Sequence, residues 1–130
     1  MRLLADHELS DAARAVFDDI RATRKSDFVN NFWRALAHDP DALRRTWEEA
    51  KAVMAPGALD PLVKELLYIA VSVTNNCQYC IASHGAAARA KGASEAQIME
   101  LMSVVALANK TNRYAIGLQV PVDDAFKPTD

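Results

Sequence analysis

Apolar residues return every three or four positions along most of this chain, and this helical spacing is the feature that most restricts its fold. No stretch alternates strictly between apolar and polar residues, as a half-buried strand would, and the chain has only four glycines. The first half carries three apolar stripes: Leu9, Ala13, Val16, Phe17 and Ile20; Phe28, Phe32 and Leu36 with Trp33 beside them; and Leu43, Trp47, Ala50 and Met54. The sequence therefore predicts an all-α protein.

The second half carries helices that are apolar almost all round. Residues 62–73 form one such segment, and residues 95 to about 109 form another, which opens with a capping-box pattern at Ser94 and Gln97. Helices of this kind have to be covered by other helices or by another subunit. We expect five or six helices in a single domain over residues 1–130, an irregular tail from Gly117, and a homo-oligomer.

Composition and charge exclude several classes of partner. The net charge is -2, from 15 basic and 17 acidic residues spread along the chain, so no basic stripe is available to follow nucleic acid. The longest apolar stretch, residues 58–73, contains Lys64 and Glu65 and is too short and too charged to span a membrane. The opening MRLLADHELS lacks the apolar region of a secretory signal. We therefore expect a cytoplasmic protein without a membrane or nucleic-acid partner, a setting in which structural disulfides are rare.

The segment that points to chemistry is a Cys-x-x-Cys pair followed by a histidine. At about 100° per residue, Cys77 and Cys80 lie about 60° apart on a helix, and His84 falls between them. Two sulfurs at this spacing can approach closely enough to bridge, and His84 can exchange a proton with Cys80. A helix beginning at about Cys77 would place that thiol where unpaired N–H groups favour an anion and make it reactive. This arrangement predicts thiol redox chemistry.

Two other interpretations of the cysteines remain open. The pair could be structural and inert, or it could bind zinc together with His84 and a carboxylate. The chain has two cysteines in all and no second Cys-x-x-Cys pair, so a zinc site would depend on that mixed ligand set.

Glu65 is the other informative position, because it lies in the segment expected to be buried. A buried carboxylate is costly unless it is paired or protonated. Burial disfavours its charged form, which would make it a proton acceptor and donor near neutral pH. The alternative is that Glu65 pairs with Lys64 or another base, or lies at a subunit interface. Tyr68, one turn later, is interpreted as a core aromatic residue.

Taken together, these positions resemble the signature of a known family. Glu65, eleven intervening residues, Cys77-x-x-Cys80, three more residues and His84 are spaced as in the alkylhydroperoxidase D-like (AhpD-like) proteins of the carboxymuconolactone decarboxylase superfamily. The resemblance covers roughly residues 58–117. It implies an AhpD-like all-α fold and a site without cofactor or metal. It also implies assembly as a trimer or a hexamer, and the resemblance to the short members favours the hexamer.

The resemblance also implies a reaction and a role for each residue. It implies a peroxidase in which Cys80 attacks a hydroperoxide, Cys77 resolves the product to a disulfide, and Glu65 and His84 relay protons. The implied reductant is a dithiol, in some members a lipoylated protein. One position departs from the best-known member, which has a histidine where this chain has Tyr79, so the relay here would be shorter. A lactone decarboxylase, or a redox-sensing module without turnover, remains the alternative.

Overall fold

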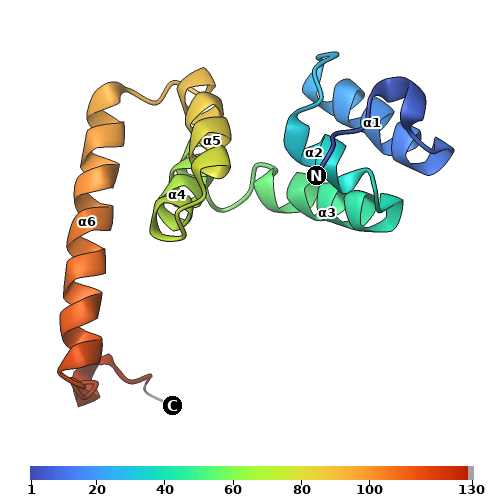
Figure 1. The fold of residues 1–130 in the computed structure, drawn as a ribbon. Helices are drawn as coiled ribbons and strands as arrows, with labels where there is room; N and C mark the ends of the chain where they lie inside the picture. Colours follow the sequence, from blue (N-terminus) through green and yellow to red (C-terminus); the bar gives the residue numbers. More distant parts are fainter. Residues whose placement is uncertain (129–130) are drawn as a thin grey trace. The chain divides into compact units, whose positions relative to one another are not determined.

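The computed structural model describes residues 1–128, and within them it contains six α-helices, two short 3-10 turns and no strand (Figure 1). This confirms the all-α class and the predicted number of helices. The chain divides into two compact units, a first unit of Met1–Ala55 and a second unit that begins at Pro56. The prediction of a single domain remains a prediction.

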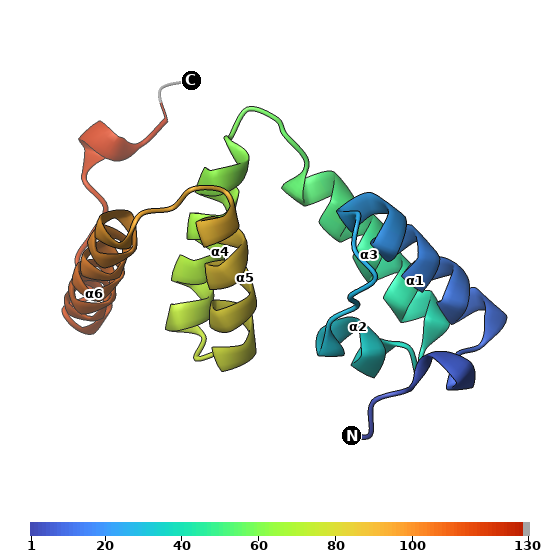
Figure 2. The ribbon, with the colours of Figure 1, turned by 90° about the horizontal axis from the view of Figure 1, so that it is seen from above.

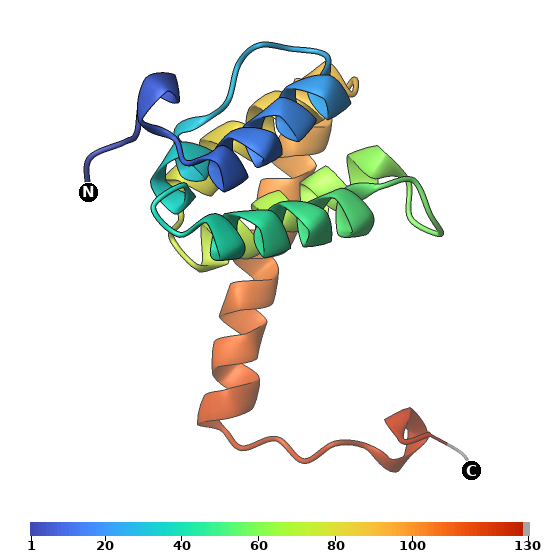
Figure 3. The ribbon, with the colours of Figure 1, turned by 90° about the vertical axis from the view of Figure 1, so that its right-hand side faces the viewer.

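The first unit consists of a 3-10 turn and three helices, with α1 and α3 side by side (Figure 3). Ser10 caps α1 by accepting from the N–H of Ala13, and Asp39 caps α3 in the same way, with a proline directly after it. The elements are η1 (Asp6–Glu8), α1 (Asp11–Arg24), α2 (Asn31–Leu36) and α3 (Pro40–Met54). The first predicted stripe faces the core of this unit, as do Leu43, Trp47 and Ala50 of the third, whereas Met54 is not part of that core.

The second predicted stripe is partly wrong. Trp33 is buried, as is Val29, but Phe28 is 70% exposed. The reason is that α2 begins only at Asn31, so Phe28 precedes the helix and does not share a helical face with Phe32. Residues spaced four apart form a stripe only where all of them are helical.

The second unit is a pair of adjacent helices, α4 and α5, with the long helix α6 packed against α4 (Figure 2). The pairing of α4 and α5 is the most extensive contact between elements of this unit, and it brings Glu65 of α4 next to His84 of α5. Asn109 on α6 donates to the hydroxyl of Thr74 at the end of α4, over 3.2 Å. The elements are α4 (Pro61–Thr74), α5 (Gln78–Ala90), α6 (Glu95–Gly117) and the 3-10 turn η2 (Asp124–Phe126).

Helix α6 begins where the capping box predicted, at Ser94, but runs past the predicted end near Asn109 to Gly117. Residues 110–116 include poor helix formers, yet they contain no glycine or proline to stop the helix. The Thr111 hydroxyl donates to the carbonyl of Leu107, 3.1 Å away, one turn back within the helix. The irregular tail then follows Gly117, as predicted.

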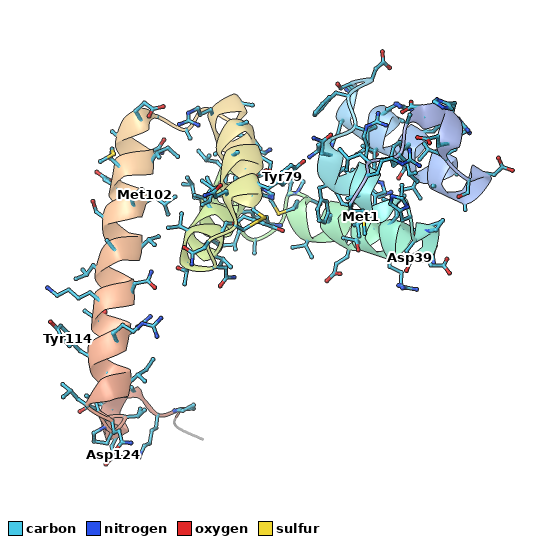
Figure 4. All side chains as sticks on the ribbon, in the orientation of Figure 1. Met1, Asp39, Tyr79, Met102, Tyr114 and Asp124 are labelled. Atoms are coloured by element: carbon cyan, nitrogen blue, oxygen red, sulfur yellow. A yellow bond between two sulfur atoms is a disulfide. The ribbon has the colours of Figure 1, made fainter. Side chains whose placement is uncertain are left out.

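Helices α4 and α6 leave much apolar surface uncovered. Leu67 on α4 is 51% exposed and Leu107 on α6 is 62% exposed, whereas Val105 is the α6 residue that is buried. Figure 4 shows side chains projecting along the whole length of α6, including the part near Tyr114. Within residues 1–128, no helix combines the length and apolarity needed to cross a membrane.

Candidate active site

The turn between α4 and α5 brings the two cysteines together. Cys77 is the N-cap of α5, and its backbone N–H donates to the carbonyl of Ser72 over 2.9 Å. The chain reaches this position through Asn76, whose φ of 57° is in the left-handed region that asparagine tolerates. Cys77 and Cys80 form a disulfide across the first turn of α5, with Cα atoms 5.3 Å apart (Figure 4, near Tyr79). The predicted helix start at about Cys77 is therefore confirmed.

Glu65 and His84 form a second pair, one residue from each of the two helices. The Glu65 side chain is buried, at 5% exposure, and its Oε2 lies 2.7 Å from Nδ1 of His84. The other oxygen, Oε1, accepts from Nζ of Lys91 at the end of α5 over 3.0 Å. Both oxygens of the buried carboxylate are thus bonded to α5, which offsets the cost of burying the charge.

The ring of Tyr68 stacks on the ring of His84, with centroids 3.6 Å apart and an angle of 18° between the planes. Tyr68 lies one turn after Glu65 on α4, so the same helix contacts the imidazole twice, through the carboxylate and through the phenol ring. The Ser72 hydroxyl donates to the carbonyl of Tyr68 over 2.7 Å. These contacts fix the plane and the position of the His84 ring.

The structure therefore brings the predicted residues together as two neighbouring pairs. Cys77 is bonded to Cys80, and Glu65 is bonded to His84. His84 lies one turn after Cys80 on the same face of α5, which connects the pairs. Within residues 1–128, no three His, Cys, Asp or Glu side chains gather closely enough to hold a metal ion.

Two contacts were missed by reasoning from the sequence: the ion pair of Lys91 and the stacking of Tyr68. A signal for Lys91 was present, because it follows His84 by seven residues, which on a helix is the same face to within about 20°. Lys64, the neighbour of Glu65 in sequence, extends toward Gly57, with Nζ 3.7 Å from the position a Cβ would take there. The interpretation of Tyr68 as a core residue is wrong, because Tyr68 is 45% exposed. Nothing in the sequence pointed to its stacking, which depends on how α4 and α5 pack.

The arrangement can move a proton. An ionised Glu65 accepts a hydrogen bond from Nδ1–H of His84, and in that tautomer Nε2 keeps a lone pair. A histidine oriented by a carboxylate in this way acts as a general base toward a nearby thiol or hydroxyl group. Cys80 lies one turn and Cys77 two turns before His84 on the same face of α5.

Comparison with known proteins identifies the family of the chain. The model of the carboxymuconolactone decarboxylase family matches residues 40–121, which include all four predicted site residues. A Paracoccus denitrificans protein described as uncharacterized protein 4 in the cox locus is 41% identical over 88 residues, covering 68% of this chain and 77% of that protein.

A solved structure is similar over nearly the whole chain. The crystal structure of the alkylhydroperoxidase AhpD core from Rhodospirillum rubrum has a TM-score of 0.92 and 56% sequence identity, and the match covers 97% of this chain and 95% of that one. A family model that spans most of the chain shows membership, and the structural match shows which fold within the superfamily this is. The chain belongs to the carboxymuconolactone decarboxylase family and has the AhpD-like fold.

Proposed function

We propose that this protein is a cysteine-based peroxidase, a thiol-disulfide oxidoreductase that reduces hydroperoxides in the cytoplasm. The observation that carries the proposal is the disulfide in the first turn of α5, one turn from a histidine bonded to a buried glutamate. The likeness to a structure described as an alkylhydroperoxidase core supports it. Lactone decarboxylation, for which the family is named, does not require a pair of cysteines, so the disulfide favours thiol chemistry.

The first step is attack of Cys80 on the peroxide. His84 Nε2 takes the proton of the Cys80 thiol, while Glu65 stabilises the imidazolium through Nδ1. The thiolate attacks the terminal oxygen of the hydroperoxide, so that an S–O bond forms and the O–O bond breaks. The alkoxide leaves with the proton held by His84, as an alcohol, and Cys80 becomes a sulfenic acid.

The second step returns the protein to the disulfide state. The sulfur of Cys77 attacks the sulfur of Cys80, an S–S bond forms, and the sulfenic oxygen leaves as water with the proton of Cys77. A dithiol then reduces the disulfide by exchange through a mixed disulfide and becomes oxidised itself. A lipoylated protein is the proposed reductant, and the oxidised state in this cycle has the bond that joins Cys77 and Cys80.

The test is thiol titration of the reduced protein with a hydroperoxide. One equivalent of cumene hydroperoxide should consume both thiols and yield one alcohol, and dihydrolipoamide should restore both thiols and support turnover.

Glu65→Gln should slow the oxidation by roughly a hundredfold, since a positioned proton-transfer group contributes at least about that factor. His84→Ala should act in the same direction, and the double variant should be less than additive. Thiols that persist in the presence of peroxide would refute the proposal.

A further inference from the structure

The ion pair between Lys91 and Glu65 has no role in the reaction as proposed so far, yet it lies within the same group of contacts. Glu65 is almost completely buried, and each of its oxygens has one bond to α5: Oε2 with Nδ1 of His84, and Oε1 with Nζ of Lys91. The carboxylate is therefore held from both sides. The Lys91 side chain is 40% exposed, so the ammonium contacts solvent while its bond reaches the buried group.

The backbone at the end of α5 fixes where Lys91 begins. Lys91 is the C-cap of the helix, and its N–H donates to the carbonyl of Ala87. Gly92, with φ of 93°, follows in the left-handed conformation typical of a residue after a helix, and the N–H of Ala93 returns to the carbonyl of Ala88 over 3.0 Å. A cation is favourable at this end of a helix, but that effect alone does not require a bond to Glu65.

We propose that Lys91 is a positioning residue of the relay, which holds the buried Glu65 carboxylate turned so that it orients His84 as the base for Cys80. This inference rests on the proposed function, because it assigns Lys91 to the same site. Without Lys91, Oε1 of Glu65 would lose the bond that holds that side of the carboxylate. A carboxylate free to turn would less often hold the proton on Nδ1 of His84, and Nε2 would less often be free to accept the thiol proton.

The charged and titratable groups that contact Glu65 and His84 come from α4 and from the α5 segment that ends at Lys91. His84 and Lys91 reach it from α5, and Tyr68 on α4 stacks on the His84 ring. Arg89, also on α5, pairs with Glu95 in the first turn of α6 over 3.1 Å. Lys91 is thus the cation bonded directly to the buried carboxylate, and its removal should disturb the orientation of His84 more than removal of a distant lysine.

The experiment measures the reactivity of the Cys80 thiol without any peroxide. A Cys77→Ser background leaves Cys80 as the thiol that is read, and serine is a favourable replacement at this N-cap position. In the reduced protein, the rate of alkylation by iodoacetamide is followed from pH 5 to pH 9 for the parent and for Lys91→Gln. We expect the alkylation rate of Lys91→Gln at pH 7 to be lower than that of the parent by roughly tenfold, the size expected for loss of a hydrogen bond to a charged group. The dependence of that rate on pH should also shift.

Three comparisons make the result specific. Lys110→Gln removes the same charge from an exposed position on α6 and should leave the rate and the profile unchanged. Lys91→Arg keeps a cation and should restore part of the rate. In a Glu65→Gln background, Lys91→Gln should have little further effect, because its action passes through the carboxylate. Should Lys91→Gln fail to fold, Lys91→Met, which keeps the unbranched stem, replaces it with the same expected results.

Two outcomes would overturn the inference: a Lys91→Gln profile that matches the parent, or an equal loss of rate with and without Glu65. Neither outcome concerns peroxide, so the proposed function is tested separately. If the parent protein fails to react with hydroperoxide but Lys91→Gln slows alkylation through Glu65, the peroxidase proposal is wrong and the positioning role of Lys91 stands.

Discussion

Cys77 and Cys80 are joined by one bond but have different surroundings. Cys77 caps α5, and its Sγ accepts from the N–H of Cys80 over 3.3 Å, at the end of the helix where N–H groups favour an anion. Cys80 is one turn further from that end and one turn before His84. The helix end favours Cys77 as the more acidic thiol, whereas the relay favours Cys80 as the one that attacks the peroxide.

Single substitutions separate these two roles. In Cys77→Ser, one equivalent of hydroperoxide should convert Cys80 to a sulfenic acid that persists and can be trapped with a sulfenate-specific reagent, because no second thiol is near to condense with it. In Cys80→Ser, the reaction of the protein with hydroperoxide should slow sharply, because the remaining Cys77 lacks the adjacent relay. Mass spectrometry of both variants gives the answer. A sulfenic acid on Cys77 in the second variant, and none on Cys80 in the first, would show that the roles are reversed.

At the scale of elements, the end of α5 places Lys91 as its C-cap, and Gly92 follows directly after it. Gly92 has φ of 93°, and an added Cβ would meet no atom within 4 Å, so an alanine there is opposed by backbone conformation alone. Gly92→Ala should lower the free energy of unfolding by about 1 kcal/mol, measured by chemical denaturation. Gly117→Ala is the matched control, because its Cβ is equally unobstructed and its φ is not positive. The control should be neutral or stabilising, and equal losses in both variants would contradict this explanation.

Two carboxylates connect the elements of the first unit. Asp19 on α1 bonds Lys51 and Trp47 on α3, and the hydrogen bond from Lys51, followed by that from Trp47, lowers the pKa of Asp19. Hydrogen bonds from Arg34 and then Arg21 lower the pKa of Asp6 in the same way. A lowered folded-state pKa means that the stabilisation is present above the unfolded value and is lost as the pH falls through the folded one.

We therefore expect the first unit to lose stability as the pH falls below about 4, the ordinary range for aspartate. Both tryptophans, Trp33 and Trp47, lie in this unit, so tryptophan fluorescence during urea denaturation reports on it specifically. Asp19→Asn removes one of the three carboxylates of this unit whose pKa is lowered, which are Asp6, Glu8 and Asp19, and should flatten the pH dependence. If the urea midpoint of unfolding changed with pH by the same amount in the variant as in the parent, the role of Asp19 would be refuted.

At the scale of the whole molecule, the uncovered apolar residues of α4 and α6 predict association. Val71 is 58% exposed and Val104 is 64% exposed, and helices with apolar residues on all sides are normally covered. We expect a trimer or a hexamer, with the hexamer favoured. Light scattering at micromolar concentration checks this, and a monomer would contradict it.

Replacing Val104 with glutamate should shift the assembly toward smaller species without unfolding the protein, whereas the same change at buried Val105 should unfold it.

The helices of this protein are determined largely by local sequence. Ser94 with Gln97 marks a helix start that the structure confirms, and Asp39 and Asp60, each before a proline, cap α3 and α4. Such starts are local because a cap is a bond between residues three or fewer apart. Cys77, Cys80 and His84 were likewise placed on one face, since the period of the helix alone decides it. The end of α6 was missed because a helix without a stop residue continues for as long as its neighbours allow.

What the sequence could not decide is how α4 and α5 meet. Glu65 could have paired with Lys64 or with a base far along the chain, and the packing of the two helices selects His84 and Lys91. The stacking of Tyr68 on His84 has the same origin. Spacing specifies which residues share a face of one helix, but contacts across two helices depend on their register and rotation, which are set by the burial of both faces together.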